Sequence, residues 1–368
     1  MEYLEKSIWK GKTWEDIKKL KVEPPKETVR RQVLDNWDHI AKPLDGMGYF
    51  ETLTAQIGAI QGTAEVDISK RAILILCSDN GIVEEGISQS GQEVTLAVMK
   101  NMAEGMSSVG KMAKAAHIDT IPVDIGVNSV QKVPGVWDRK LCLGTRNFKV
   151  EPAMTEEEAA AAVFTGIELV SLCKEKGYGI LGAGEMGIGN TTTSSAVTAS
   201  LLGCHEAEVT GRGAGLSDHK LCRKQQIIRE AIEKYDLKHA HAFRVLQTVG
   251  GLDIAGLAGV CIGGALYHIP IVLDGFITLA AALAAERMVP GVKQYLIPSH
   301  QGREPGAQKL LDALGLVPVI HGAMALGEGT GAVMMIALLD LAHRIYEDGT
   351  TFSCMDMEPY ERFGQQDR

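Results

Sequence analysis

YGILGAGEMGIGNTTTSS, residues 178–195, is the stretch of this sequence that decides the expected fold. An apolar run of strand length leads into Gly182, Gly184 and Gly187, which have the spacing G-x-G-x-x-G. Asn190 and the threonines after it then open a helix rich in alanine and serine. Because Asn or Thr at a helix N-cap precedes free backbone N–H groups, this end of a helix favours an anion. The stretch therefore predicts a strand, a phosphate-binding turn and a helix in succession.

The same unit recurs along the chain. Further apolar runs that end in polar loops occupy residues 71–77, 120–126, 269–275, 294–300 and 316–322, and alanine-rich stretches of helical period occupy residues 156–174, 191–202 and 278–288. This alternation predicts an α/β fold with a mostly parallel sheet covered by helices on both faces. Ligands of such sheets bind beyond the carboxyl ends of the strands, where the sequence places Asp79, Asp124, Glu185, Asp274 and Ser299.

Composition narrows the class of protein. The 368 residues are 45% hydrophobic and 23% charged, with a formal net charge of −9 and no run of lysines and arginines. A nucleic-acid partner is therefore not expected, because such binding depends on neutralising phosphates. No apolar run has the length of a membrane span, and residues 1–21 are charged and amphipathic, so we expect a cytoplasmic protein. The seven cysteines are scattered singly, and neither a disulfide framework nor a zinc site is expected.

The glycine spacing alone leaves a dinucleotide open as the ligand. Three features count against it: the helix is expected to start after Gly189, Glu185 would lie beside a doubly charged pyrophosphate, and the acids about twenty residues further on do not end a β-rich run. The loop also lacks the G-K-[ST] of a P-loop. A monophosphate fits better, with Glu185 directed to sugar hydroxyls or to the reacting centre.

A second glycine-rich element carries an isolated acid. Glu328 lies between Gly327 and Gly329, just ahead of a long apolar helix. The flanking glycines permit close approach to a ligand, which is the placement that a general base requires. The alternative is an exposed acid in the first turn of the helix, favoured by the helix dipole. The polar loop at residues 78–95 leaves a similar choice between an active-site loop and a surface loop.

Together these elements resemble the nicotinate-nucleotide:5,6-dimethylbenzimidazole phosphoribosyltransferase family of cobalamin biosynthesis. The matching motifs occur in the order of the family and extend from about residue 50 to the carboxyl terminus. They are DNGIVEEGISQSGQEVT (79–95), GTRNF (144–148) with EPAMT (151–155), GEMGIGNTTTSS (184–195), GRGAGLSD (211–218) followed by RK (223–224), VGGLDIAGLAG (249–259), VLDGF (272–276) and LGEGTGA (326–332).

The resemblance implies an architecture. It implies a doubly wound, mostly parallel, Rossmann-like sheet with a small helical domain formed from the two ends of the chain, in a homodimer. The expected boundaries are an N-terminal helical segment at residues 1–48, a catalytic domain at 49–345, and a tail at 346–368 that packs with the small domain.

The resemblance also implies a reaction. Nicotinate mononucleotide would donate its phosphoribosyl group to a nitrogen of 5,6-dimethylbenzimidazole, giving α-ribazole 5′-phosphate and nicotinate without a cofactor or a metal. The pyridinium nitrogen leaves as a neutral base, and the donor carries a monophosphate, so the chemistry requires no magnesium clamp. The step that needs help is the loss of a proton from the attacking ring, which one carboxylate accomplishes.

Site residues follow from the matching motifs. Glu328 would be the general base, and Lys224 with the glycine turn would hold the ribose phosphate. Ser88 and Gln92 would line the pocket of the aromatic acceptor. The expected substrate-binding residues of the turn are Glu185, Met186, Gly187, Gly189, Asn190, Thr191 and Thr192, and those without a particular role are Glu84, Asp274, Ser299 and Gly327.

Two departures from the family bear on the acceptor. Many members carry histidine where this chain has Asn80, and the loop that reads SQSGQ at residues 88–92 contains a proline in others. Related enzymes act on phenols or purines, so a phenol or purine acceptor is an alternative. A nicotinamide-dependent dehydrogenase, indicated only by the glycine spacing, and a nucleotide-binding subunit without catalysis are the hypotheses from other classes.

Overall fold

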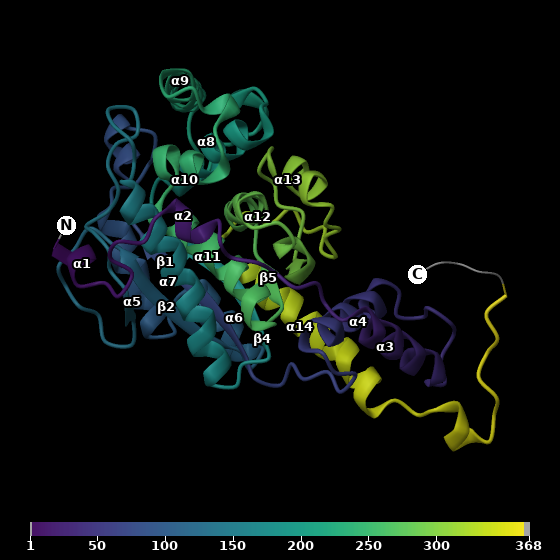
Figure 1. Ribbon diagram of the computed structural model, residues 1–368. Coiled ribbons are helices and arrows are strands. Elements are labelled where there is room, and N and C mark those ends of the chain that lie inside the picture. The colour runs from purple at the N-terminus through teal and green to yellow at the C-terminus, as the bar shows by residue number, and fades with distance from the viewer. Residues whose placement is uncertain (1, 364–368) are drawn as a thin grey trace.

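The computed structural model describes residues 2–363 and is built around a parallel sheet of six strands (Figure 1). The strand order is β3-β2-β1-β4-β5-β6, so the order reverses between β1 and β4. This confirms the expected doubly wound, mostly parallel α/β fold. The strands are β1 (Arg71–Ser78), β2 (Asp119–Gly126), β3 (Trp137–Asp138), β4 (Ile180–Met186), β5 (Ile271–Leu273) and β6 (Leu296–Pro298).

Strand β1 lies at the centre and is buried on both faces. Ala72, Leu74 and Leu76 belong to one hydrophobic core, whereas Ile73 and Ile75, on the opposite face, belong to the other. Because side chains alternate along a strand, a strand between two layers of helices needs an apolar residue at every position. This requirement explains the continuous apolar run that the sequence shows there.

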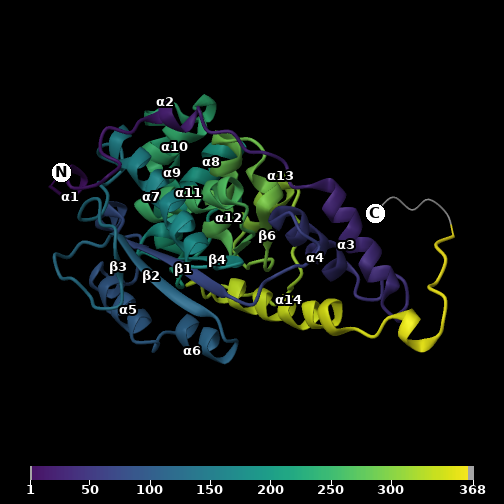
Figure 2. The ribbon, with the colours of Figure 1, turned by 60° about the horizontal axis from the view of Figure 1, so that its bottom comes forward.

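Helices cover both faces of the sheet, and Figure 2 shows the two layers on opposite sides of the strands. One layer contains α7 (Glu156–Glu175), α8 (Asn190–Leu202), α9 (Asp218–Lys234), α10 (Ala242–Val249), α11 (Leu252–Tyr267), α12 (Phe276–Met288) and α13 (Ala307–Leu314). The other contains α5 (Glu93–Ala103), α6 (Ser108–Ala115) and α14 (Thr330–Asp348), with α3 (Glu27–His39) and α4 (Tyr49–Gln61) at its end. None of the helices described is long and apolar enough to span a membrane.

Most of the expected elements are confirmed, and two expectations are wrong. Residues 316–322 form no strand but a single bridge from Ile320 to His300, because Pro318 has no N–H to donate to a ladder. Residues 2–22, part of the N-terminal segment expected to be helical, contain only the single-turn helices α1 (Glu2–Glu5) and α2 (Trp14–Ile17).

The N-terminal segment contacts two different parts of the molecule. Trp9 stacks on Phe164 at 5.2 Å and Trp14 on Phe243 at 5.3 Å between ring centroids, so residues 2–22 lie over α7 and α10. By contrast, the apolar side chains of α3 are buried with α4 and α14, among them Trp37, whose exposed fraction is 0%. The domain boundaries expected from the sequence stay a prediction.

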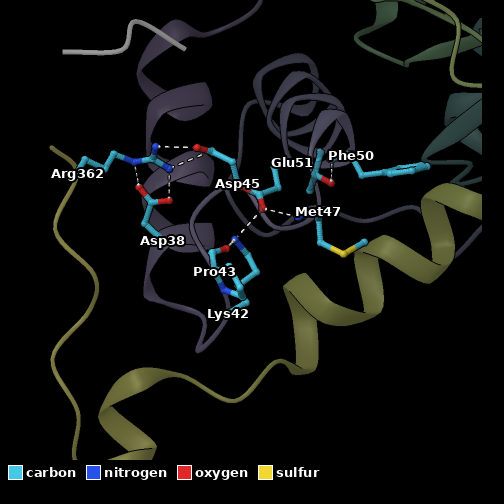
Figure 3. A network of polar contacts seen from close by, with 9 residues as sticks. Asp38, Lys42, Pro43, Asp45, Met47, Phe50, Glu51 and Arg362 are labelled. Atoms are coloured by element: carbon cyan, nitrogen blue, oxygen red, sulfur yellow. Dashed lines mark hydrogen bonds and ion pairs between the residues drawn. The ribbon is translucent and has the colours of Figure 1, made fainter. Parts of the chain in front are cut away.

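The C-terminal tail lies along α3 and the connection to α4. Arg362 forms ion pairs with Asp38 at 2.7 Å and with Asp45 at 3.0 Å (Figure 3). Its bonds to these two carboxylates raise the pKa of Arg362. In the same connection, Lys42 pairs with the buried Glu51 at 2.7 Å. Segments from the two ends of the described chain are therefore held side by side.

Candidate active site

A cavity of about 250 Å³ opens at the carboxyl edge of β4, β5 and β6. Its walls are the loops that follow these strands, the glycine-rich turn before α14, and two polar loops near residues 87–89 and 212–216. Apolar side chains form part of the wall: Ile87, Leu216, Phe276, Ile277, Met324 and Leu326. The cavity therefore combines an apolar wall with polar groups at strand ends, as expected for a small-molecule site at the switch point of a parallel sheet.

The glycine turn after β4 directs the N-terminus of α8 at the cavity. A Cβ at Gly187 would lie 2.3 Å from the carbonyl oxygen of Ser78, so only glycine fits there. Helix α8 begins at Asn190, after the glycines as the sequence predicts, but its N-cap is Gly189, with φ of +95°, and not the expected Asn or Thr, because the turn requires a left-handed residue there. Thr191, in the first turn, lines the cavity. The helix dipole favours an anion at this end of α8.

Lys224 contacts Thr191 at the start of α8 but does not itself line the cavity. Its side chain is fully buried in α9, and its Nζ donates to Thr191 Oγ1 at 3.0 Å and to the carbonyl oxygen of Gly211 at 3.2 Å. Burial lowers the pKa of Lys224 to about 8, and the charge of Glu304 opposes this only in part. An anion bound at Thr191 would stabilise the protonated amine of Lys224. The positive charge of Lys224 would in turn strengthen the binding of the anion.

Glu185 and Asp253 form a buried pair of carboxyl groups beside the turn. The Asn190 side-chain amide donates to both of them, with 3.2 Å to Asp253. Burial raises the pKa of Glu185 to about 8 and that of Asp253 to about 7. At pH 7 Glu185 is therefore largely neutral, which removes the repulsion that a charged carboxylate would exert on a nearby phosphate.

Glu328 also lines the cavity, in a turn with an unusual backbone. Gly327, Glu328 and Gly329 have φ of +85°, +63° and +90°, three consecutive residues in the left-handed region. The carboxylate is half-buried and accepts the backbone N–H of Val109, at the start of α6, at 3.2 Å. Since α14 begins at Thr330, Glu328 is not an exposed residue of its first turn. Burial raises the pKa of Glu328, the Val109 N–H opposes this, and the charge of Asp274 adds to it.

Two loops approach each other at the entrance to the cavity. The Gln89 side-chain amide donates to the carbonyl oxygen of Gly215, and Lys220 Nζ donates to that of Ser88 at 3.2 Å. The sequence left open whether residues 78–95 form a surface loop or an active-site loop. Residues 87–89 of this loop contribute to the wall of the cavity.

The cavity brings together ten of the site residues expected from the sequence. They are Ser88, Glu185, Met186, Gly187, Gly189, Asn190, Thr191, Asp274, Gly327 and Glu328. Their roles toward a substrate stay predictions, because the cavity defines a place and not a contact with a ligand.

Five expected site residues do not line the cavity. Besides Lys224, they are Thr192, which is fully buried, and Ser299, which donates to the carbonyl oxygen of Asp274 at 2.8 Å. Gln92 donates to the carbonyl oxygen of Asn80 at 3.2 Å and accepts from Asn128. Glu84 is exposed and pairs with Asn147. These side chains lie behind or beside the wall.

Sequence reasoning did not assign two polar residues of the wall, Arg212 and Glu304. His300, which follows an expected strand, also lines the cavity. The signal for Arg212 was present in the glycine-rich motif GRGAGLSD, whereas nothing in the spacing singles out Glu304. Within residues 2–363, no three His, Cys, Asp or Glu side chains are grouped so that they could hold a metal ion.

Comparison with known proteins shows extensive similarity. A family model described as phosphoribosyltransferase matches residues 22–355. The nicotinate-nucleotide–dimethylbenzimidazole phosphoribosyltransferase of Acetivibrio thermocellus is 42% identical over 337 residues, which cover 92% of this chain and 95% of that protein. The protein of the same name from Ruminiclostridium cellulolyticum is 41% identical over 345 residues, covering 94% and 97%.

A solved structure agrees with these relatives. The crystal structure of CobT from Thermus thermophilus superposes with a TM-score of 0.85 at 36% sequence identity. The match covers 90% of this chain and 100% of that chain.

Replacing Glu185 with Gln should flatten the decrease in stability with pH. Burial raises the pKa of Glu185 to about 8, so the folded protein keeps a proton that the unfolded chain releases near its ordinary value of 4.5. Stability then falls as pH rises between these values, by up to about 1.4 kcal/mol per pH unit for one proton. Glu185→Gln removes this contribution, which urea unfolding at about pH 5.5 and about pH 8 would measure.

Glu158→Gln is the matched control for a buried acid outside the site. Burial opposes the ionisation of Glu158, but Arg146 and the Thr155 N–H lower its pKa overall. Glu158 therefore stabilises the fold by a constant amount at any pH above its ordinary pKa. Glu158→Gln should lower the free energy of unfolding equally at about pH 5.5 and about pH 8. An unchanged pH dependence in Glu185→Gln would contradict the raised pKa.

Proposed function

The chain belongs to the nicotinate-nucleotide–dimethylbenzimidazole phosphoribosyltransferase family, and we propose that it transfers the phosphoribosyl group of nicotinate mononucleotide to 5,6-dimethylbenzimidazole. The products are α-ribazole 5′-phosphate and nicotinate, in the assembly of the nucleotide loop of cobalamin. One observation carries the assignment of groups: Glu328 and the first residues of α8 line the same cavity.

The donor phosphate binds at the N-terminus of α8. The N–H groups and the hydroxyl of Thr191 contact it, and the charge of Lys224 acts through Thr191. Glu185, with its pKa raised to about 8 by burial, is largely protonated and serves as a hydrogen-bond donor or acceptor to the ribose. These features support a monophosphate nucleotide as the donor.

The acceptor lies against the apolar wall, near Ser88 and Met186. An aromatic ring buries its faces against Phe276, at the start of α12, and Leu216, in the loop before α9, which both line the cavity. As its nitrogen attacks the ribose, the other ring nitrogen becomes acidic, and the carboxylate of Glu328 takes its proton. The raised pKa of Glu328, caused first by burial, makes it a stronger base than an exposed glutamate.

The leaving group requires less help than the nucleophile. The pyridinium nitrogen of the donor becomes neutral as the glycosidic bond breaks, so the bonding electrons leave on nicotinate without protonation. The enzyme contributes by orienting the two reactants and by restricting water, which would otherwise compete for the ribose.

We further propose that the protein works as a homodimer in the cytoplasm. Helix α14 exposes Met334, Leu341 and Ile345 on its surface, with Leu341 at 68% of its full exposure. An apolar helix face of this kind supports burial against a second copy. All seven cysteines are free thiols, as is usual in a reducing compartment.

The dimer is tested by sedimentation equilibrium, which should give twice the chain mass. Leu341→Glu should shift the protein towards the monomer, because a charge on the apolar face of α14 would have to lose its water in the interface. A monomer mass for the unaltered protein would contradict the proposed homodimer.

The acceptor is tested by competition. Nicotinate mononucleotide is incubated with an equimolar mixture of dimethylbenzimidazole, benzimidazole, adenine, phenol and p-cresol, and the products are identified by mass spectrometry. The expected dominant product is α-ribazole 5′-phosphate, with release of nicotinate. A purine or phenolic product would keep the reaction and change the acceptor, whereas no release of nicotinate with any acceptor would contradict the proposal.

Replacing Glu328 with Gln tests the general base. The variant keeps the size of the side chain but cannot accept the proton, so kcat should fall by about 10²-fold or more. The affinity for nicotinate mononucleotide, measured by calorimetry, should be retained, because the donor phosphate binds at α8. Glu347→Gln, at the exposed end of α14, is the control that should keep kcat. Full activity of Glu328→Gln would exclude Glu328 as the base.

A further inference from the structure

Asp274 directly follows β5 at the wall of the cavity, but its carboxylate is engaged by the protein itself. Oδ2 accepts the backbone N–H of Gly329 at 3.0 Å, and Oδ1 accepts that of Gly331 at 2.7 Å. The residue is only 3% exposed. Both oxygens accept hydrogen bonds from N–H groups on either side of Thr330, where α14 begins. The carboxylate therefore caps the N-terminus of α14, although Asp274 is not part of that helix.

The turn that carries Glu328 is held from its other side by Glu185. A Cβ at Gly327 would lie 2.8 Å from Glu185 Oε1, so the carboxyl group of Glu185 lies directly against the turn, and the backbone N–H of Glu328 acts to lower the pKa of Glu185 against the larger effect of burial. Glu185 belongs to β4 and Asp274 follows β5, its neighbour in the sheet. Two carboxyl groups from adjacent strands therefore hold consecutive parts of one turn.

This turn needs such support because its backbone is unfavourable. Glu328 is a non-glycine residue with φ of +63°. A non-glycine residue in this region is strained, and it persists only where the surroundings fix it. The turn is fixed by its two bonds to Asp274, by the bond of the Thr330 N–H to the carbonyl oxygen of Gly327 at 3.0 Å, and by its contact with Glu185.

We propose that Asp274 is a positioning residue for the reaction: by binding the N–H groups of Gly329 and Gly331, it fixes the turn that presents the Glu328 carboxylate to the acceptor. This inference rests on the proposed role of Glu328 as the base. It gives Asp274 a role beyond the expected contact with substrate, because both of its oxygens accept bonds from the turn.

Other groups that face Asp274 fit this role. His300, in the loop after β6, lies close enough for its charge to favour the ionised carboxylate, although burial has the larger effect and raises the pKa of Asp274. Ser299 Oγ lies 2.9 Å from His300 Nδ1 and donates to the carbonyl oxygen of Asp274. The titratable groups around the Glu328 turn are thus Asp274, His300 and Glu185, from three neighbouring strand ends.

The test is the variant Asp274→Asn in the full chain. Asparagine keeps one acceptor but turns an NH₂ group towards the second backbone N–H, so the turn loses one of its bonds. Because small displacements of a catalytic group are costly, kcat should fall by about 10²-fold. The affinity for nicotinate mononucleotide, measured by calorimetry, should remain that of the unaltered enzyme.

The pH profile of kcat distinguishes positioning from a merely structural effect. The charge of Asp274 raises the pKa of Glu328, after burial, so its removal should move the acid limb of the profile to lower pH. Asp340→Asn is the matched control, since Asp340 anchors the same helix through Arg71 at 2.8 Å but lies far along α14 from the turn. Asp340→Asn should reduce thermal stability and leave kcat and its pH profile unchanged.

Specific outcomes overturn the inference. Weaker donor binding by Asp274→Asn with an unshifted acid limb would make Asp274 a substrate ligand, and an unchanged kcat would remove any role. If Asp274→Asn does not fold, Asp274→Glu is the deciding variant, because it displaces the carboxylate but keeps the charge. Its kcat should fall while the acid limb of its pH profile stays unshifted. An unchanged kcat would refute the proposal. Full activity of Glu328→Gln would refute the proposed base itself, which separates that failure from this one.

Discussion

Carboxyl groups buried at the carboxyl ends of the strands determine how the loops of this protein are arranged. Asp79 follows β1 and Asp124 lies near the end of β2, and each accepts a backbone N–H from the loop after β2, at Asn128 and Val127. Asp274, after β5, does the same for the turn before α14. A buried carboxylate must find donors because water does not reach it. Each acid therefore fixes the loop that supplies its N–H groups, on the side of the molecule where the cavity lies.

The same burial gives the site its electrostatic character. Several acids so close to a phosphate would repel it if all were charged. Burial raises the pKa of Glu185 to about 8 and of Asp253 to about 7, and Asn190 supplies neutral hydrogen bonds to both. Glu185 is thus largely neutral at pH 7, and Lys224 lies behind Thr191. The phosphate position that we propose at the start of α8 therefore lies beside a largely neutral acid.

How much could be predicted depended on whether the signal was local. The strands buried on both faces were predicted because they form continuous apolar runs, and the start of α8 was predicted because Asn190 directly follows the last glycine of the turn. Residues 316–322 look like a strand of the same kind but lie beyond the last ladder, where Pro318 cannot donate, so only one bridge forms. Nothing in their local pattern reveals their position at the edge.

The site shows the same division. The glycines that flank Glu328 mark it in the sequence, because three consecutive left-handed residues need them. The partners that hold the turn come from strands β4 and β5, and no spacing along the chain brings Glu185 or Asp274 to it. Adjacency in the strand order does so: neighbouring parallel strands lie about 4.8 Å apart, so acids at their ends reach amides of one short turn. The position of Glu328 is therefore a property of the sheet topology.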